Sequence, residues 1–161
     1  MTFPDDLAEM ARGVLDTNRY LTLGTTEPDG RPRVSPVYFT HVDYRTFYWV
    51  SSPRAQHSAN VADRPEVAFV VYDSTAQIGA GRAVYVGATA AQVPADQLAA
   101  ACDEAFAGAV DAGVTRFRPE DVSGDADLRL YRARATSWEV HIRGRDPVYG
   151  TGVDTRREVR L

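Results

Sequence analysis

The sequence predicts a single mainly β domain, an antiparallel barrel with helical additions. About six segments have the apolar alternation or the density of β-branched and aromatic residues that is typical of strands. Most connections between these segments are short and carry Pro, Gly or Asp. No regular alternation of strand and helix appears, which disfavours a doubly wound parallel sheet. A length of 161 residues fits one domain.

The start of the chain predicts one helix followed by two strands. Residues 4–18 have apolar side chains at helical spacing, with Pro and two Asp in the first turn. Those apolar residues are Leu7, Met10, Ala11, Val14 and Leu15. Residues 20–26 and 33–40 predict strands, joined by a Glu-Pro-Asp-Gly turn at 27–30. Pro36 has no N–H to give a neighbouring strand, so it predicts an edge, a bulge or an opening of the sheet.

The next segments predict a hairpin, a short helix and two further strands. Residues 46–51 form a third strand, which we expect to pair with the second across a short turn. We predict a short helix that starts after Pro53 and ends near Asp63, because Pro65 opposes its continuation. Residues 66–72 are nearly all apolar, which predicts a central strand covered on both faces. Residues 82–93 predict a long strand, and Gly87 within it predicts a bulge or a sharp bend.

The last third of the chain predicts a helix, a strand and a tail. Residues 94–110 have inward-facing apolar residues at helical spacing, and residues 128–142 predict the last long strand. Residues 143–161 are polar and contain several glycines. We therefore predict a barrel domain over 1–142 and a C-terminal tail over 143–161, ordered partly by a partner subunit or not at all.

The composition argues against several classes of function. The net charge of −4 disfavours a general nucleic-acid surface, because phosphate backbones are bound by clustered cations. All 18 basic residues are Arg, so an anion site must use Arg, His, hydroxyl or backbone N–H groups, and lysine Schiff-base chemistry is absent. The single Cys102 cannot form an internal disulfide and is expected to be a buried apolar residue. No leader pattern and no membrane-spanning apolar run is present, so we expect a cytoplasmic protein.

Two kinds of catalytic centre find no support in the residues. The histidines His41, His57 and His141 are far apart in the sequence and form no His-x-x-x-His pair, so we predict no metal site. No Gly-x-Ser-x-Gly motif is present, which argues against a serine hydrolase.

The segment after the third strand combines hydroxyl, guanidinium and imidazole groups. Ser51 and Ser52 end the strand, and Arg54 and His57 begin the short helix. A helix N-terminus has unpaired N–H groups and the positive end of the helix dipole. These groups together suit a phosphate. The residues alone leave open the alternative of an ordinary capped helix with solvated polar groups.

Several motifs occur here in a recognisable order. They are Arg33-Val-Ser-Pro-Val37, Trp49-Val-Ser-Ser52, His57-Ser-Ala-Asn60 and Arg64-Pro-Glu-Val-Ala68. In order and spacing they resemble the pyridoxamine 5′-phosphate oxidase-like, FMN-binding split-barrel superfamily, over about residues 7–93. The resemblance implies a six-stranded antiparallel split β-barrel of Greek-key type. It also implies a homodimer with two cofactors at the interface.

The resemblance further implies which residues would contact FMN. The 33–37 strand would run beside the isoalloxazine ring, and the 49–57 segment would hold the ribityl chain and phosphate. Many relatives have Lys or Arg in the short helix, where this chain has Arg54, Gln56 and His57. Arg82 could reach a phosphate from the same or the second subunit, and Trp138 is a candidate for packing near the ring. The predicted cofactor-binding residues are Arg33, Val34, Ser35, Pro36, Val37, Trp49, Val50, Ser51, Ser52, Arg54, Gln56, His57, Arg82 and Trp138.

The implied function is an oxidoreductase that transfers hydride between FMN and a small organic substrate. Coenzyme F-420, a deazaflavin, is an alternative cofactor because it too presents a phosphate. Flavins carry the hydride chemistry themselves, so we name no catalytic residue, and we do not expect the vitamin-pathway oxidase activity itself. Two other hypotheses are a flavin carrier or sensor without turnover, and a haem-binding split barrel with His41, His57 or His141 as axial ligand.

Overall fold

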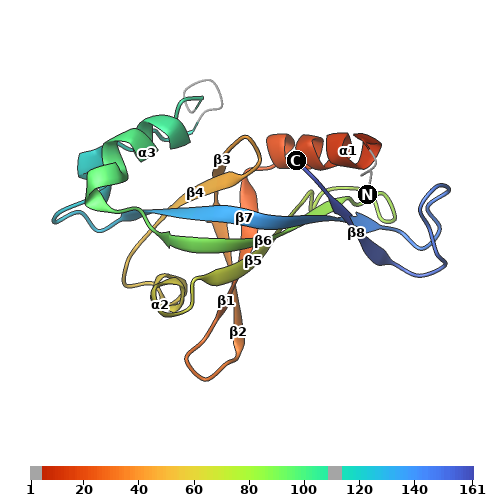
Figure 1. Cartoon of the computed structure of the whole chain (residues 1–161), viewed down its shortest axis with the longest axis horizontal. Coiled ribbons are helices and arrows are strands. Elements are labelled where there is room, and N and C mark those ends of the chain that lie inside the picture. Colours follow the sequence, from red (N-terminus) through yellow and green to blue (C-terminus); the bar gives the residue numbers. More distant parts are fainter. Residues whose placement is uncertain (1–4, 109–113) are drawn as a thin grey trace.

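The computed structural model describes residues 5–108 and 114–161 and is built around one curled antiparallel sheet (Figure 1). Its strands are β1 (Tyr20–Thr26), β2 (Pro32–Tyr38), β3 (Thr40–Val42), β4 (Thr46–Ser51), β5 (Glu66–Tyr72), β6 (Ala83–Gln92), β7 (Arg129–Ile142) and β8 (Thr155–Val159). Its helices are α1 (Asp5–Thr17), α2 (Gln56–Asp63) and α3 (Leu98–Ala105), with 3₁₀ turns η1 (Ala95–Gln97) and η2 (Pro119–Val122). The mainly β antiparallel architecture predicted from the sequence is confirmed.

Strand β7 is the centre of the sheet. The strand order is β2-β1-β5-β6-β7-β4-β3, and β8 also pairs with β7. One edge of β7 pairs with β6 from Tyr131 to Val140. The other edge pairs first with β4 and then, from Trp138 onward, with β8. The 14 residues of β7 therefore join both halves of the curled sheet.

The two strands with proline or glycine signals behave as predicted. Strand β2 is the edge of the sheet, with β1 on its one paired side, which accounts for Pro36 in its middle. The register between β6 and β7 shifts between Gly87 and Ala88, which confirms the bulge. A Cβ at Gly87 would lie 2.7 Å from the Ser137 hydroxyl oxygen, so a side chain at this crossing would require that hydroxyl to move.

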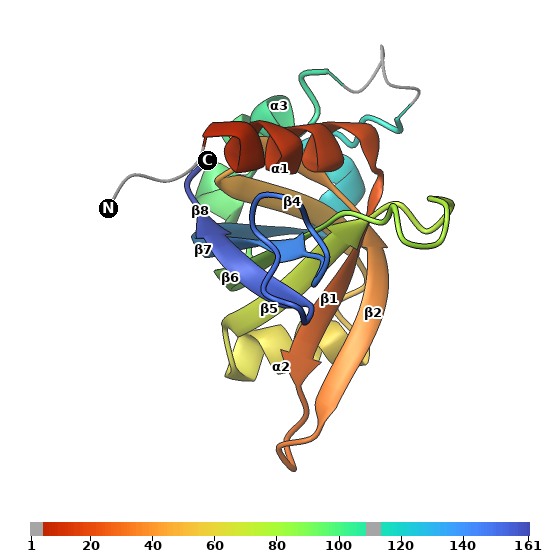
Figure 2. The ribbon, with the colours of Figure 1, turned by 90° about the vertical axis from the view of Figure 1, so that its right-hand side faces the viewer.

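Two helices close the two ends of the curl. Figure 2 shows α1 and α2 at opposite ends of the sheet, with the β1–β2 hairpin projecting beyond α2. The inner face of the sheet and the apolar stripe of α1 form the main core, in which Leu15, Leu23 and Phe47 are almost completely buried. A second, smaller core lies under α3, on the outer side of β4, around Tyr48 and Leu130. Among the described residues, no helix is long and apolar enough to cross a membrane.

Two predicted strands differ from the observed ones. The predicted strand 33–40 is divided into β2 and β3, and it is β3, not β2, that forms the hairpin with β4. The break falls at Phe39, whose side chain is buried in the core while its N–H donates to the Arg19 carbonyl. The prediction that β5 is covered on both faces was wrong, because Ala68 and Tyr72 point outward and are exposed. Its apolar outer residues belong to an uncovered surface instead.

The C-terminal segment contains a strand that the sequence analysis did not predict. Strand β8 pairs with β7 within the same chain, and the sheet over the described residues has eight strands rather than six. Val159 is fully buried and Leu161 nearly so, which fixes the segment to the main core. The predicted helix 94–110 is observed as η1 followed by α3, and its last two residues lie outside the described part of the chain, as does residue 4 of the first predicted helix.

Candidate functional site

The start of α2 is shaped by hydrogen bonds to Ser52. The Ser52 carbonyl accepts from the Ala55 N–H at 3.1 Å and from the Ser58 hydroxyl at 2.8 Å. The Ser52 hydroxyl oxygen accepts from the Arg54 N–H at 3.2 Å. No side chain caps the helix at Ala55. The first N–H groups of α2 are therefore left without a side-chain acceptor, next to two serines and an arginine.

His57 joins the helix to the end of β4. Its Nε2 atom and the Ser51 hydroxyl oxygen lie 2.9 Å apart in a hydrogen bond. Burial, and then the positive charge of Arg33, lowers the pKa of His57 below its ordinary value of 6.5. The imidazole is therefore neutral at neutral pH. The effect of Arg33 also shows that the start of β2 lies near the start of α2, although the two residues are 24 positions apart in the sequence.

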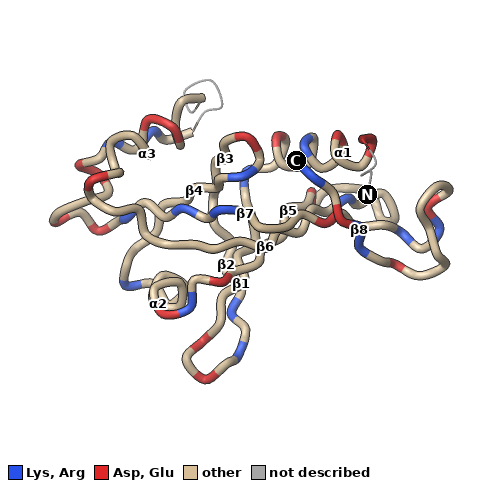
Figure 3. The backbone as a smooth tube through the Cα atoms, viewed as in Figure 1, with Lys and Arg blue, Asp and Glu red and all other residues tan. Residues whose placement is uncertain are grey.

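The two guanidinium groups of this region are held by surface carboxylates. Arg54 pairs with Asp127 at 3.2 Å, and their side chains are 82% and 85% exposed. Arg33 pairs with Glu27 at the base of the β1–β2 hairpin, whose charged residues can be followed in Figure 3. Ion pairs at such exposed positions contribute little free energy, in the range of about 0–1 kcal/mol. Arg54 can therefore exchange Asp127 for a bound anion at small cost, whereas in the Arg33 pair the Glu27 side chain is only 18% exposed.

A buried polar pair fixes α2 against the sheet. Asn60 is 1% exposed and its Nδ2 atom donates to the Thr25 hydroxyl oxygen at 3.0 Å. The Asn60 Oδ1 atom accepts from the Gln56 side chain at 2.9 Å. Thr25 lies on the inner face of β1 and is itself 4% exposed. In the sequence, Asn60 was recognised only as part of a motif. An amide side chain on the inner side of a short helix was the feature that could have predicted this buried hydrogen bond.

Several predicted site residues gather here. Ser51, Ser52, Arg54 and His57 lie at the β4–α2 junction, and Gln56 stands on the first turn of α2. On β2, residues 33, 35 and 37 share the face of Leu21, Leu23 and Thr25 on the neighbouring strand, whereas Val34 and Pro36 are exposed on the outer face. Val37 is buried in the main core. The side chains of the β2 segment thus divide between the two faces of the sheet.

The side chains of Trp49 and Val50 are taken up by packing. Trp49 is 2% exposed and stacks on Tyr131, with ring centroids 5.7 Å apart, and its Nε1 atom is buried without a hydrogen-bond partner. Val50 is half-buried against the second core. The side chain of Trp49 is therefore closed to a ligand, and that of Val50 is accessible only in part.

Two predicted residues lie away from α2 within the protomer. Arg82 precedes β6 at the Tyr72 end of the β5–β6 hairpin, whereas α2 leads into the Glu66 end. Trp138 lies between β6 and β8, and its Nε1 atom donates to the Tyr44 carbonyl at 2.9 Å. A role for either residue at the α2 site stays a prediction that needs a second subunit.

The arrangement suits an anion and offers no metal centre. Two hydroxyl groups and an uncapped helix N-terminus lie at the β4–α2 junction together with Arg54, and Arg33 is near enough to lower the pKa of His57. These donors fit a phosphate group. Over residues 5–108 and 114–161, no three His, Cys, Asp or Glu side chains are arranged to hold a metal ion.

The fold defines the class of protein. A curled antiparallel half-barrel, with helices at its ends, is the architecture of the split-barrel proteins. Within that class, the pyridoxamine 5′-phosphate oxidase family matches residues 7–141. The chain therefore belongs to this family. Among curated proteins, none matches the chain.

Solved structures share this fold at low sequence identity. A haem-binding protein from Mycobacterium smegmatis is 22% identical with a TM-score of 0.68, covering 98% of this chain and 60% of that one. An FAD-binding protein from Mesorhizobium loti is 20% identical with a TM-score of 0.62, covering 83% and 92%. An F420 reductase is 21% identical with a TM-score of 0.57, covering 80% and 94%. The chain spans about three-fifths of the M. smegmatis protein. The fold thus occurs in both flavin-related and haem-binding proteins.

Proposed function

We propose that this protein is a flavin-binding oxidoreductase that uses FMN, or the deazaflavin coenzyme F-420, and acts as a homodimer. Membership of the pyridoxamine 5′-phosphate oxidase family supports the proposal. The observation that carries it is local. The Arg33 guanidinium at the start of β2 acts on His57, which is hydrogen-bonded to Ser51 at the uncapped start of α2.

The phosphate would be held at the β4–α2 junction. Ser51 and Ser52 would donate hydroxyl hydrogens, and the first N–H groups of α2 would point at the anion. Arg54 would leave Asp127 and contribute a charge-assisted hydrogen bond. A dianion at this place would favour the imidazolium form of His57, so the residue would change from a neutral to a cationic partner.

The ring would lie along β2, whose backbone would hydrogen-bond its polar edge. A flavin supplies hydride transfer when it is bound. The protein's part is to bind, to orient and to exclude water, for which the packed side chains of Trp49 and Tyr131 provide a rigid floor behind the junction. No titratable residue is assigned as a catalytic acid or base.

A second copy of the chain would cover the outer face of β2, β1 and β5. This face carries apolar residues that the protomer leaves uncovered, with Val34 70%, Tyr20 62% and Tyr72 49% exposed. Val34 and Ala68 flank Gly24 on this face, so the three strands present a continuous surface of apolar and small residues. Contiguous apolar surface of this kind marks interaction sites. A dimer through this face would bury β2, and with it the proposed ring position.

The first experiment identifies the bound group. Mass spectrometry of small molecules released from the purified protein, with titrations of FMN, coenzyme F-420 and haemin followed by absorption, separates the three cofactors. Binding of FMN or F-420 with reduction and rapid turnover of an acceptor supports the oxidoreductase. Binding without turnover points to a carrier or sensor, and a Soret band with no flavin binding points to the haem alternative.

The second experiment locates the phosphate. Arg54→Ala should raise the FMN dissociation constant by about 10- to 150-fold, the equivalent of a charge-assisted hydrogen bond of about 1.5–3 kcal/mol. Asp127→Asn removes the competing carboxylate and should leave FMN binding equal or tighter. Arg116→Ala is the matched control, because it breaks a similar exposed pair with Asp103. Equal affinities for all three variants would show that the phosphate binds elsewhere.

A further inference from the structure

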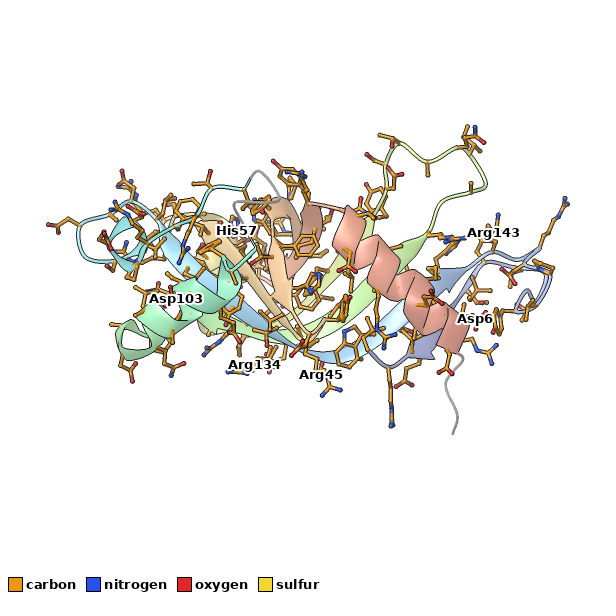
Figure 4. The ribbon with its side chains drawn as sticks, turned by 90° about the horizontal axis from the view of Figure 1, so that it is seen from above. Asp6, Arg45, His57, Asp103, Arg134 and Arg143 are labelled. Carbon is orange, nitrogen blue, oxygen red and sulfur yellow. The ribbon has the colours of Figure 1, made fainter. Side chains whose placement is uncertain are left out.

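A second hollow lies at the end of the molecule opposite α2. It is a cleft of about 970 Å³ between α1, the loop over residues 73–82 and the segment over 141–149. Figure 4 shows His57 towards one end of the molecule and Arg143, which lines the cleft, towards the other. The volume is at the upper end of the range for small-ligand sites, about 300–1,000 Å³. Of the predicted cofactor-binding residues, Arg82 alone lines this cleft, and none of the residues of the β4–α2 junction does.

The floor and one wall of the cleft are apolar. Leu7, Val14 and Ile142 are buried beneath it, and Met10 is half-buried on the α1 wall. Gly13 lies on the same wall, and a Cβ built there would meet no atom within 4 Å. Glycine in a helix interior costs about 1 kcal/mol relative to alanine. Gly13 therefore leaves open space along α1 at a position where a side chain would fit the helix better.

The opposite wall carries cations with little to neutralise them. Arg82 makes no hydrogen bond or ion pair within the part of the chain that the structure describes. Arg143 donates to the carbonyl oxygen of Gly79, a neutral acceptor. His141 is 24% exposed and lies 3.5 Å from Asp154. Arg82 is thus available at this wall, whereas the charge of Arg143 is partly offset by Asp146, whose pKa it helps to lower.

Most carboxylates of the cleft already accept hydrogen bonds from the protein. Asp6 accepts from the Tyr149 hydroxyl at 2.8 Å. Hydrogen bonds from Thr75 lower the pKa of Asp73, and backbone N–H groups of residues 148 and 149 lower the pKa of Asp146. Glu9, on the α1 side, is the one lining carboxylate without a partner among the described residues. The free positive charge therefore faces α1 across an apolar floor.

The rim of the cleft is also apolar. Val148, which lines the cleft on the 141–149 segment, is 73% exposed. An exposed apolar side chain at this position extends the apolar surface of the cleft towards solvent.

We propose that this cleft is a second binding site, for an amphipathic anion such as a medium- or long-chain carboxylate. The apolar chain would lie along Met10 and Gly13, over the buried floor. The anionic head would reach Arg82 and Arg143. The site is independent of the flavin proposal, since it shares no residue with the β4–α2 junction.

Laurate titrated into the full-length protein, followed by calorimetry and amide chemical shifts, tests the proposal. Laurate should shift resonances of α1 and the 73–82 loop, and dodecylamine, which has the opposite charge, should bind at least tenfold more weakly. Arg82→Ala should weaken laurate binding at least tenfold. Gly13→Phe should block the cleft and abolish binding, whereas the matched control Gly13→Ala should leave it within twofold.

Further variants distinguish laurate binding in this cleft from cofactor binding at the β4–α2 junction. Glu9→Gln should leave laurate binding equal or tighter, because it removes the free carboxylate. Arg54→Ala, or saturation with FMN, should leave it unchanged. Absence of laurate binding, equal binding of dodecylamine, or normal binding by a folded Gly13→Phe variant would overturn the proposal. Should Gly13→Phe fail to fold, the exposed Arg82→Ala variant decides alone.

Discussion

The buried hydrogen bond between Asn60 and Thr25 gives the sharpest test of how α2 is held. Thr25→Val keeps the shape of the side chain but removes the acceptor of the Asn60 Nδ2 hydrogen. Because Asn60 is 1% and Thr25 4% exposed, water cannot replace the lost partner. A buried donor left without an acceptor costs about 1–3 kcal/mol. We expect the free energy of unfolding to fall by that amount.

A double variant measures the coupling between Thr25 and Asn60 apart from the effect of each substitution alone. Thr25→Val with Asn60→Leu removes both polar groups, so its loss of stability should be at least 1 kcal/mol smaller than the sum of the two single losses. Urea unfolding followed by tryptophan fluorescence measures each value, at one protein concentration because association shifts apparent stability. Thr22→Val, on the outer side of the same strand, is the control. Additive losses, or a Thr25→Val loss no larger than that of Thr22→Val, would refute the reasoning.

Three further predictions follow from single groups. The pKa of His57, measured by NMR, should lie below 6.5 in the free protein and rise when FMN binds. The stability that the neutral imidazole contributes is present above pH 6.5 and is lost as pH falls through the lowered pKa. If this pKa falls or does not change when FMN binds, the phosphate does not lie beside the His57 imidazole. Gly24→Ala should lower the free energy of unfolding by about 1–3 kcal/mol, because the new Cβ would lie 3.0 Å from a backbone carbonyl oxygen. Gly87→Ala should lower it less, because the new Cβ there would meet a serine hydroxyl that can rotate. Equal thermal shifts would contradict this. Burial and a neighbouring glutamate raise the pKa of Tyr48 to about 12. Its phenolate should therefore be missing from the ultraviolet titration at pH 11. The stability that the neutral phenol contributes is present below pH 10 and is lost as pH rises through 12.

Much of the fold could be predicted because its signals are local. The alternation in β1, the proline in β2 and the glycine in β6 each report a property of one segment and its immediate neighbours. Strand β8 gave no such signal, because its Thr-Arg-Arg-Glu-Val sequence is charged and only Val159 is buried. Its pairing is set by the register with β7, which no local pattern encodes.

In the candidate site too, the contacts between residues close in sequence could be predicted, whereas those between distant residues could not. The groups from Ser51 to His57 are close in sequence, so a strand end followed by a helix start was enough to bring them together. The pairs Thr25–Asn60 and Arg54–Asp127 join residues 35 and 73 positions apart, and their contact depends on how the sheet curls. Trp49 was predicted as a cofactor-binding residue, but alternation along β4 turns its side chain into the core.

The long strand β7 has a mechanical consequence. It has a partner strand on each side at residues 131–134 and 138–140, and the two short partners on one side, β4 and β8, lie at its two ends. Either partner can fray while β7 stays attached to β6. Solvent deuterons should therefore reach the peptide groups of Tyr131 to Arg134 last, when the molecule opens as a whole, and residues 135–137, where the register with β6 shifts, earlier.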